Sequence, residues 1–255
     1  MPKPLSVRDL QPQLAANRRY WTGLAGAGGA DDPGAGLPIY RTGVAHPLMN
    51  GVLRVRDVPL DDAVAEARRR LDGSVWAWWV GADSDEGTAE RLVARGAEEI
   101  ATLPVMALDL DRIATSEAPG DLGFRTITDA TEMAEYVGTF AAPMGITTGL
   151  DLVMEREIGF GCPGVVRRAA VVDGRMVGTC TLSLATDVAA LYCVTTSPDV
   201  RRQGIATALT LDALRIARNS GRRVATLQAS GEGEPVYRRI GFETVSRYRL
   251  LTFGE

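Results

Sequence analysis

The stretch from Leu191 to Ala206, LYCVTTSPDVRRQGIA, constrains the fold of this chain more than any other part. It begins within an almost continuously apolar run over residues 188–194, which is typical of a central strand buried on both faces. A short polar loop over residues 201–203 follows, and Gly204 then opens an apolar-periodic helix. A buried strand that leads through a short loop into a helix indicates a layered α/β fold.

The same loop has the properties of an anion-binding site. Backbone N–H groups at a helix N-terminus lack intrahelical partners, and the helix dipole favours negative charge there. Small residues let an anion approach the backbone closely, and arginines add charge and donors. The residues with these properties are Arg201, Arg202, Gln203, Gly204, Ile205 and Ala206. Taken alone, the hexapeptide fits an ordinary strand-to-helix turn with exposed arginines equally well.

The periodicity of residues 123–253 predicts strands and helices in the order β-α-α-β-β-β-α-β-α-β-β. The Asp173-Gly174 pair between two β-prone runs is a strong hairpin signal. Thr128 has the side chain of a helix N-cap. The expected strands are 124–127, 168–172, 175–185, 188–194, 223–228, 242–246 and 248–253, and the expected helices are 128–140, 150–158, 204–219 and 235–239.

The segment QASGEGEPVYRRIGF at residues 228–242 adds a second motif downstream of the loop. With both motifs present, residues 123–253 resemble the GNAT superfamily, the N-acetyltransferases that use acetyl-coenzyme A. The family's two motifs fall on Arg201-x-x-Gly204-x-Ala206, which matches its pyrophosphate loop, and on Tyr237 ahead of Gly241-Phe242. The resemblance implies a mixed α/β fold with a central splayed sheet flanked by helices.

The resemblance also implies a mechanism. The strands 188–195 and 223–228 would diverge, and the pantetheine arm of the coenzyme would pair with backbone near Val194 and Thr195. A backbone N–H near Val194 would stabilise the oxyanion formed when an amine attacks the thioester. Tyr237 would then protonate the thiolate. The alternative for Tyr237 is a packing role on a short amphipathic helix.

Two departures from the family pattern concern the general base and an asparagine. Many members carry a carboxylate on the central strand, whereas AALYCVTT has none, so Asp187, Glu157 and a water chain are the candidates for the base. Ser230 stands where the family often has asparagine. It either bonds the coenzyme or a main-chain group, or caps the following helix. Cys193 reads as a core residue because no histidine lies near it in the sequence.

The first half reads as a degenerate GNAT-like unit over residues 1–112, followed by a polar linker at 113–121 and the acetyl-coenzyme A-binding unit at 122–255. The alternative is an unrelated α/β capping domain. The glycine-rich segment 23–36 reads as a flexible loop, because no strand precedes it and no helix follows it. We expect further strands at 52–55, 75–80, 98–102 and 105–110, with a break at Pro104, and helices at 57–71 and 86–95.

Composition narrows the class of protein. The 255 residues carry a net charge of −4, which argues against nucleic acid as a main partner. The three cysteines, Cys162, Cys180 and Cys193, have no metal-ligand spacing, so we expect no metal site and reduced thiols in a cytoplasmic protein. We see no signal peptide or membrane span. His46 is the sole histidine and reads as structural.

Three functions remain open at this stage. The first is an N-acetyltransferase that acts by direct attack of a primary amine of a small molecule on acetyl-coenzyme A. The second is a non-catalytic acyl-coenzyme A sensor module, suggested by the missing strand carboxylate. The third is a protein or peptide N-acetyltransferase. The sequence does not identify the acceptor, and it leaves the oligomeric state open, with a homodimer among the alternatives.

Overall fold

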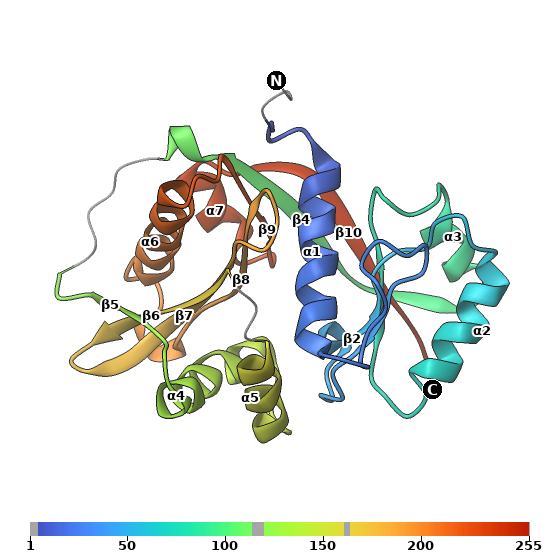
Figure 1. The fold of residues 1–255 in the computed structure, drawn as a ribbon, viewed down its shortest axis with the longest axis horizontal. Coiled ribbons are helices and arrows are strands. Elements are labelled where there is room, and N and C mark those ends of the chain that lie inside the picture. The colour runs from blue at the N-terminus through green and yellow to red at the C-terminus, as the bar shows by residue number, and fades with distance from the viewer. Residues whose placement is uncertain (1–4, 114–119, 161–163, 255) are drawn as a thin grey trace.

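A computed structural model describes residues 5–113, 120–160 and 164–254. Within them, one ten-stranded mixed sheet runs in the order β1-β2-β3-β10-β4-β9-β8-β7-β6-β5 (Figure 1). The strands are β1 Ile39–Arg41, β2 Asn50–Val52, β3 Ala77–Val80, β4 Ala97–Asp109, β5 Gly123–Thr126, β6 Val165–Val172, β7 Arg175–Ser183, β8 Ala189–Thr196, β9 Val224–Gln228 and β10 Glu243–Phe253. The α-helices are α1 Leu10–Ala25, α2 Leu60–Arg70, α3 Thr88–Val93, α4 Ala130–Ala141, α5 Leu150–Gly159, α6 Ile205–Asn219 and α7 Glu234–Ile240.

Three apolar clusters attach the helices to the sheet. Side chains of α1, α4 and α5 share one cluster, those of α6 and α7 share a second, and those of α2 and α3 share a third. Figure 1 shows α1 standing between the two halves of the sheet, with α6 and α7 on one side of it and α2 and α3 on the other. Each helix therefore buries its apolar stripe against strands, as a layered α/β fold requires.

The two longest strands, β4 and β10, join the halves of the molecule. They pair antiparallel from Glu243–Ala107 to Phe253–Ala97, and β10 also pairs with β3 while β4 also pairs with β9. A strand from the end of the chain thus completes the sheet of the N-terminal half, and a strand from residues 97–109 completes that of the C-terminal half. Part of the predicted linker, residues 114–119, lies outside the described residues.

The prediction of two strands on either side of Pro104 was wrong, because β4 is continuous through it. Pairing with β9 begins only at Val105, so the preceding part of β4 has β10 as its single partner strand. An unpaired edge tolerates the missing N–H of proline. The two strands expected at 242–246 and 248–253 are likewise one strand, β10, with register shifts between Thr244 and Ser246 and between Leu250 and Leu251.

Most local signals in the C-terminal half agree with the structure, and one helix cap differs. Asp173 and Gly174 have φ values of 50° and 78° and connect β6 to β7, as the hairpin signal predicts. The N-cap of α4 is Asp129 rather than Thr128, because the Asp129 side chain accepts a hydrogen bond from the Glu132 N–H at 2.9 Å. The Glu132 carboxylate in turn accepts from the Thr128 N–H at 2.9 Å.

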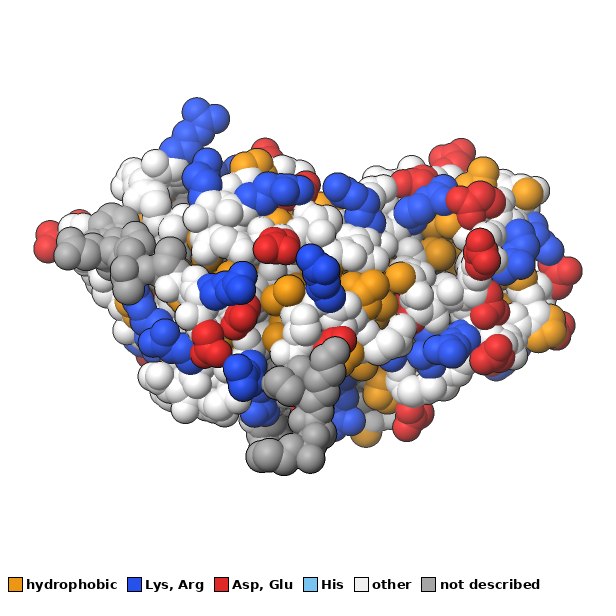
Figure 2. All heavy atoms as spheres, turned by 90° about the horizontal axis from the view of Figure 1, so that it is seen from above, with side chains coloured by type: hydrophobic (Ala, Val, Ile, Leu, Met, Phe, Trp, Pro, Cys, Tyr) orange, Lys and Arg blue, Asp and Glu red, His pale blue; other side chains and the backbone are white. Residues whose placement is uncertain are grey.

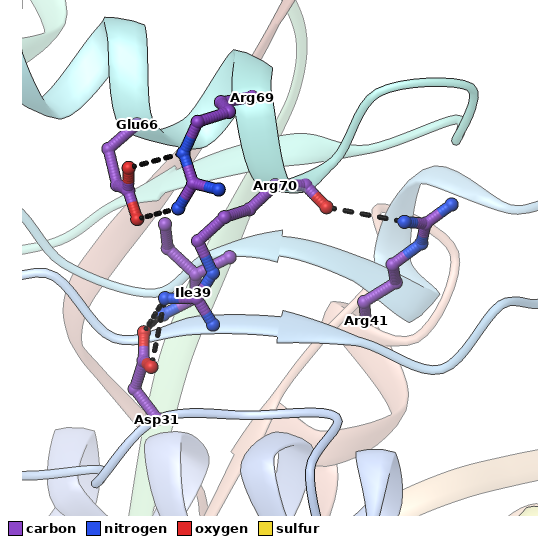
Figure 3. Close-up of polar contacts among 6 residues, drawn as sticks. All are labelled: Asp31, Ile39, Arg41, Glu66, Arg69 and Arg70. Carbon is purple, nitrogen blue, oxygen red and sulfur yellow. Dashed lines mark hydrogen bonds and ion pairs between the residues drawn. The ribbon is translucent and has the colours of Figure 1, made fainter.

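No helix or strand was predicted within residues 1–50, and the described part of this region contains α1 and β1. Helix α1 takes up the first residues of the glycine-rich segment, and the remainder forms turns and one isolated bridge from Ala30 to Tyr40. In Figure 3, Asp31 accepts from the Ile39 N–H and pairs with Arg70 of α2, while Arg41 donates to the Arg70 carbonyl. These contacts tie the segment to β1 and α2.

Candidate functional site

The parallel strands β8 and β9 part after a short ladder. Their Cα partners run from Ala189–Ala225 to Leu191–Leu227 and stop there, although β8 continues to Thr196 and β9 to Gln228. The two strands were predicted to diverge, and in the structure they pair at three positions only. Beyond them, the edge of β8 that faces β9 is not used for sheet pairing, which leaves backbone groups available to an added partner.

A β-bulge lies where the two strands part. Thr179 pairs with Thr195 and Thr181 pairs with Tyr192, so Cys193 and Val194 both lie opposite Cys180. Cys193 has a φ of 49°, an unusual value for a residue other than glycine. The Cys193 carbonyl accepts a hydrogen bond of 2.7 Å from the Thr179 hydroxyl. The bulge thereby turns the two residues to opposite faces, Cys193 toward the cluster of α1 and Val194 toward that of α6.

The loop between β8 and α6 exposes its predicted anion-binding residues. Residues 201–204 are exposed, and Gly204, with a φ of 81°, is the N-cap of α6. The first helical N–H group with a backbone acceptor is that of Ala208, which donates to the Gly204 carbonyl at 3.0 Å. No acidic side chain occurs in the first turn of α6. The open N–H groups of Ile205 and Ala206 thus face an environment that favours an anion.

Ile205 contributes to this site by its backbone only. Its side chain is 4% exposed and belongs to the apolar cluster under α6, close to the Cα of Gly178. Ala206 is half-buried. The structure thus brings together five of the six predicted loop residues at the surface and turns the sixth side chain into the core.

Tyr237 is 8% exposed and packs in the same apolar cluster as Cys180 and Val194. Its ring meets Phe242 edge-on at 5.8 Å between centroids. Among the described residues, its hydroxyl makes no hydrogen bond. Burial, with a smaller effect of the Cys180 thiol, raises the pKa of Tyr237 above its ordinary value, so the phenol keeps its proton at neutral pH.

Ser230 is exposed, and its hydroxyl accepts a hydrogen bond of 3.1 Å from the Gly233 N–H. The Ser230 carbonyl also accepts from Glu234 at 2.9 Å, at the start of α7. Ser230 thus bonds a main-chain group and orders the turn that precedes Tyr237, whereas the N-cap of α7 is Gly233. A bond from Ser230 to the coenzyme stays a prediction.

Comparison with protein families finds that residues 167–250 match the model of an acetyltransferase (GNAT) domain. The chain carries a GNAT domain. The match begins in β6 and ends in β10, so it includes the bulge, the loop before α6 and Tyr237. A search of curated proteins finds no match.

Several solved structures share the fold. A GCN5-related N-acetyltransferase from Kribbella flavida aligns at a TM-score of 0.73 and 16% identity, over 96% of each chain. A protein of unknown function from Staphylococcus epidermidis aligns at 0.63 and 16% identity, over 88% of this chain and 93% of the other. A tandem GNAT protein from the clavulanic acid biosynthesis pathway aligns at 0.58 and 17% identity, over 84% and 77%. The architecture is thus a GNAT-like fold with a smaller GNAT-like N-terminal unit.

Helix α1 of the N-terminal unit covers the β8 bulge of the GNAT domain, which sequence reasoning missed. The Tyr20 ring stacks on Tyr192 at 3.5 Å between centroids, and its hydroxyl lies 3.8 Å from the Cys193 sulfur. Burial raises the pKa of Cys193 to about 12, so the thiol is protonated at neutral pH and unsuited to nucleophilic attack. The available signal was the spacing of Gln13, Asn17, Tyr20 and Leu24, which places them on one helix face.

The two carboxylates considered as general base lie in very different places. Asp187 is exposed in the turn before β8, at the end of that strand opposite to the bulge. Glu157 of α5 is 1% exposed, and its Oε2 lies 2.7 Å from Nε of Arg167 on β6. A buried carboxylate held by a guanidinium is committed to a structural ion pair. Asp187 is therefore accessible but far from the bulge along β8, and Glu157 is buried and paired, so neither is placed to act as the base.

His46 lies in the N-terminal unit, where its Nδ1 accepts a hydrogen bond of 3.2 Å from the Leu48 N–H. Cys180 is buried and Cys193 half-buried, whereas Cys162 lies outside the described residues. In the described part of the chain, no group of three or more His, Cys, Asp or Glu side chains is arranged to hold a metal ion. No helix found there has the length and apolar character needed to cross a membrane.

Proposed function

We propose that the GNAT domain binds acetyl-coenzyme A in the gap between β8 and β9 and transfers the acetyl group to a primary amine of a small molecule. The observation that carries the proposal is the end of the parallel ladder at Leu191–Leu227, next to the open N-terminus of α6. An unpaired strand edge beside an anion-favouring helix end suits a ligand that combines an amide-containing arm with a pyrophosphate.

The residues of the loop fit a pyrophosphate. Arg201, Arg202 and Gln203 are exposed and would supply side-chain donors, while Gly204 and Ala206 leave room next to the backbone. The free N–H groups at Ile205 and Ala206 would bind phosphate oxygens. Val194 and Thr195 would offer backbone groups to the pantetheine arm. Ser230 would lie at the edge of the coenzyme site, in the turn that its hydroxyl stabilises.

The chemistry follows from what these residues hold in place. The coenzyme supplies an activated thioester when bound. A backbone N–H at the bulge, near Val194, would stabilise negative charge on the thioester oxygen during direct attack by the amine. Tyr237 would donate its proton to the departing thiolate. Burial raises the pKa of Tyr237, so the phenol would hold its proton until the thiolate departs.

The acceptor is expected to bind near α4, α5 and the loop over residues 143–149. The face of β8 that α1 covers has no room for it, because Tyr20 packs there against Trp21 and Phe160 and all three side chains are buried. Because β8 carries no carboxylate, the amine would lose its proton to water or to a group outside this strand.

Calorimetric titration of acetyl-coenzyme A tests the binding step. Gly204→Glu places a negative charge at the N-terminus of α6 and should abolish binding by the folded protein. Gly221→Glu is the matched control, because Gly221 has a φ of 80°, lies just past the other end of α6, and has no atom within 4 Å of an added Cβ. Equal binding by both variants, or none by the wild type, would refute the proposal.

A second candidate function is a non-catalytic acyl-coenzyme A sensor, and the absence of a carboxylate from β8 favours it. A panel of small amines and of peptides separates the alternatives. Turnover of small amines supports the proposed enzyme, and turnover of peptides alone supports a protein or peptide N-acetyltransferase. Tight coenzyme binding with no turnover supports the sensor.

Three further expectations remain part of the proposal. We expect a cytoplasmic protein, and we expect size-exclusion chromatography with light scattering to decide between a monomer and a homodimer. We also retain the division into units at 1–112 and 122–255. The exchange of β4 and β10 between the halves of the sheet predicts that neither piece folds alone.

A further inference from the structure

Arg54 follows β2 in the N-terminal unit and is buried without an anionic partner. The residue is 7% exposed. One terminal nitrogen of its guanidinium donates to the carbonyl of Gly34 at 2.7 Å and also to that of Ala35. Its Nε has no hydrogen-bond partner. No carboxylate pairs with it among the residues that the structure describes. Burying a guanidinium with an unsatisfied donor and no counter-charge is costly.

The charges around Arg54 do not compensate it. Arg18 of α1 is 5% exposed and pairs with the buried Asp83, so that ion pair is already neutral. Arg18 also donates to the Pro33 carbonyl at 2.7 Å, directly before the two carbonyls that Arg54 binds. Arg56 is a third cation nearby; burial and then Arg56 lower the pKa of Arg54, and Asp57, whose Oδ2 lies 3.6 Å from Nε of Arg56, opposes them. The buried group therefore carries one uncompensated positive charge.

An open pocket of about 470 Å³ adjoins this charge. Arg54 and Arg56 line it together with Gly34 and Gly36 of the glycine-rich segment. A Cβ on Gly36 would collide with the Arg56 carbonyl, so glycine is needed for this close approach. Asp57 is the one carboxylate on the pocket wall, and its side chain is 88% exposed at the rim.

We propose that this pocket binds the oxyanion group of a small molecule, a carboxylate or a phosphate, with Arg54 at its base and Arg56 at its rim. The ligand would pair with the Arg54 guanidinium where it lines the pocket and would neutralise the buried charge. The volume lies in the range of small-molecule sites, roughly 300–1,000 Å³. Helix α2 begins nearby with Asp61 and Asp62 in its first turn, so its N-terminus contributes nothing to anion binding here and the arginines would carry the site.

The test follows the arginine side chains directly. The full-length protein, labelled with ¹⁵N, is titrated with inorganic phosphate and separately with acetate, and the Nε–Hε signals of Arg54 and Arg56 are monitored after assignment by through-bond correlation. We expect a saturable shift of both signals. The stronger of the two probes shows whether the ligand is a phosphate or a carboxylate. Because the signals are specific to these residues, binding at the loop before α6 does not interfere.

Two variants should change the affinity of the pocket for the anion in opposite directions. Arg56→Gln should weaken binding about fivefold, and Asp57→Asn should tighten it about fivefold, since one unit charge at contact range near water is worth about 1 kcal/mol. Arg112→Gln and Asp121→Asn change the same charges at exposed positions elsewhere and should leave the affinity unchanged. An absent shift, a shift of equal size with sodium chloride, or equal affinity of Asp57→Asn and wild type would overturn the proposal.

Discussion

Replacing Arg167 by methionine tests whether the buried pair with Glu157 is structural. In the folded protein the guanidinium bonds the Glu157 carboxylate at 2.7 Å, the Glu157 carbonyl at 2.5 Å and the Phe160 carbonyl at 3.3 Å. Arg167→Met removes all three hydrogen bonds and leaves a carboxylate that is 1% exposed without a partner. Breaking a buried pair in this way costs about 3–5 kcal/mol of the free energy of unfolding.

The same variant should show a characteristic dependence on pH. Burial raises the pKa of Glu157, and loss of Arg167 removes the opposing effect of its positive charge. A carboxyl group with a raised folded pKa contributes stability that is present below its unfolded pKa and is lost as pH rises through the folded pKa. The deficit of Arg167→Met relative to wild type should therefore grow from pH 5 to pH 8, by at most about 1.4 kcal/mol per pH unit.

Urea unfolding followed by tryptophan fluorescence measures both effects. Arg168→Met is the matched control, because the adjacent Arg168 pairs with Asp212 at 2.7 Å with both side chains less buried. We expect it to cost about 1 kcal/mol, with little change between the two pH values. A loss below 1 kcal/mol for Arg167→Met, or a deficit independent of pH, would show that the carboxylate is not held in a dry environment.

Three further changes have defined expected outcomes. Tyr237→Phe should lower kcat about 100-fold or more at unchanged coenzyme affinity, which steady-state kinetics and calorimetric titration measure. Its free energy of unfolding should stay within about 0.5 kcal/mol of the wild type, because the hydroxyl has no hydrogen-bond partner among the described residues. Leu209→Ala should cost about 2–5 kcal/mol in urea unfolding because Leu209 is 0% exposed, whereas Leu150→Ala, at a position 41% exposed, should cost far less. Deletion of residues 248–255 should abolish cooperative unfolding followed by near-ultraviolet circular dichroism, since β3 would lose its β10 partner.

Local chemistry made much of the C-terminal half predictable. Asp173-Gly174 predicted a hairpin because its tight turn needs positive φ at both positions. The apolar run over residues 188–194 predicted a buried strand, and the stripe on α6 predicted a helix of nearly the observed length. The exposed loop at the start of α6 was predictable for the same reason, and its role as an anion site stays a prediction.

Helix α1 was not predictable with the same rules. It buries Gln13 and Asn17 completely, and these polar side chains break the apolar pattern that would mark its inner face. They are accommodated because Gln13 donates to the Val7 carbonyl and Asn17 accepts from Trp21. Such partners exist only once the chain is folded, so the spacing of these residues along one helix face did not by itself show that α1 would cover Tyr192.

The sequence by itself therefore determined the elements whose signals lie within a few residues of one another: the hairpin, the buried strand, the loop before α6 and the GNAT motifs. Tertiary structure decided the exchange of β4 and β10, the bulge at Cys193, the pairing of Glu157 with Arg167 and the uncompensated charge of Arg54. These features depend on contacts between residues far apart in the chain. Periodicity and composition describe only which face of an element is buried, and they do not specify which distant element covers it.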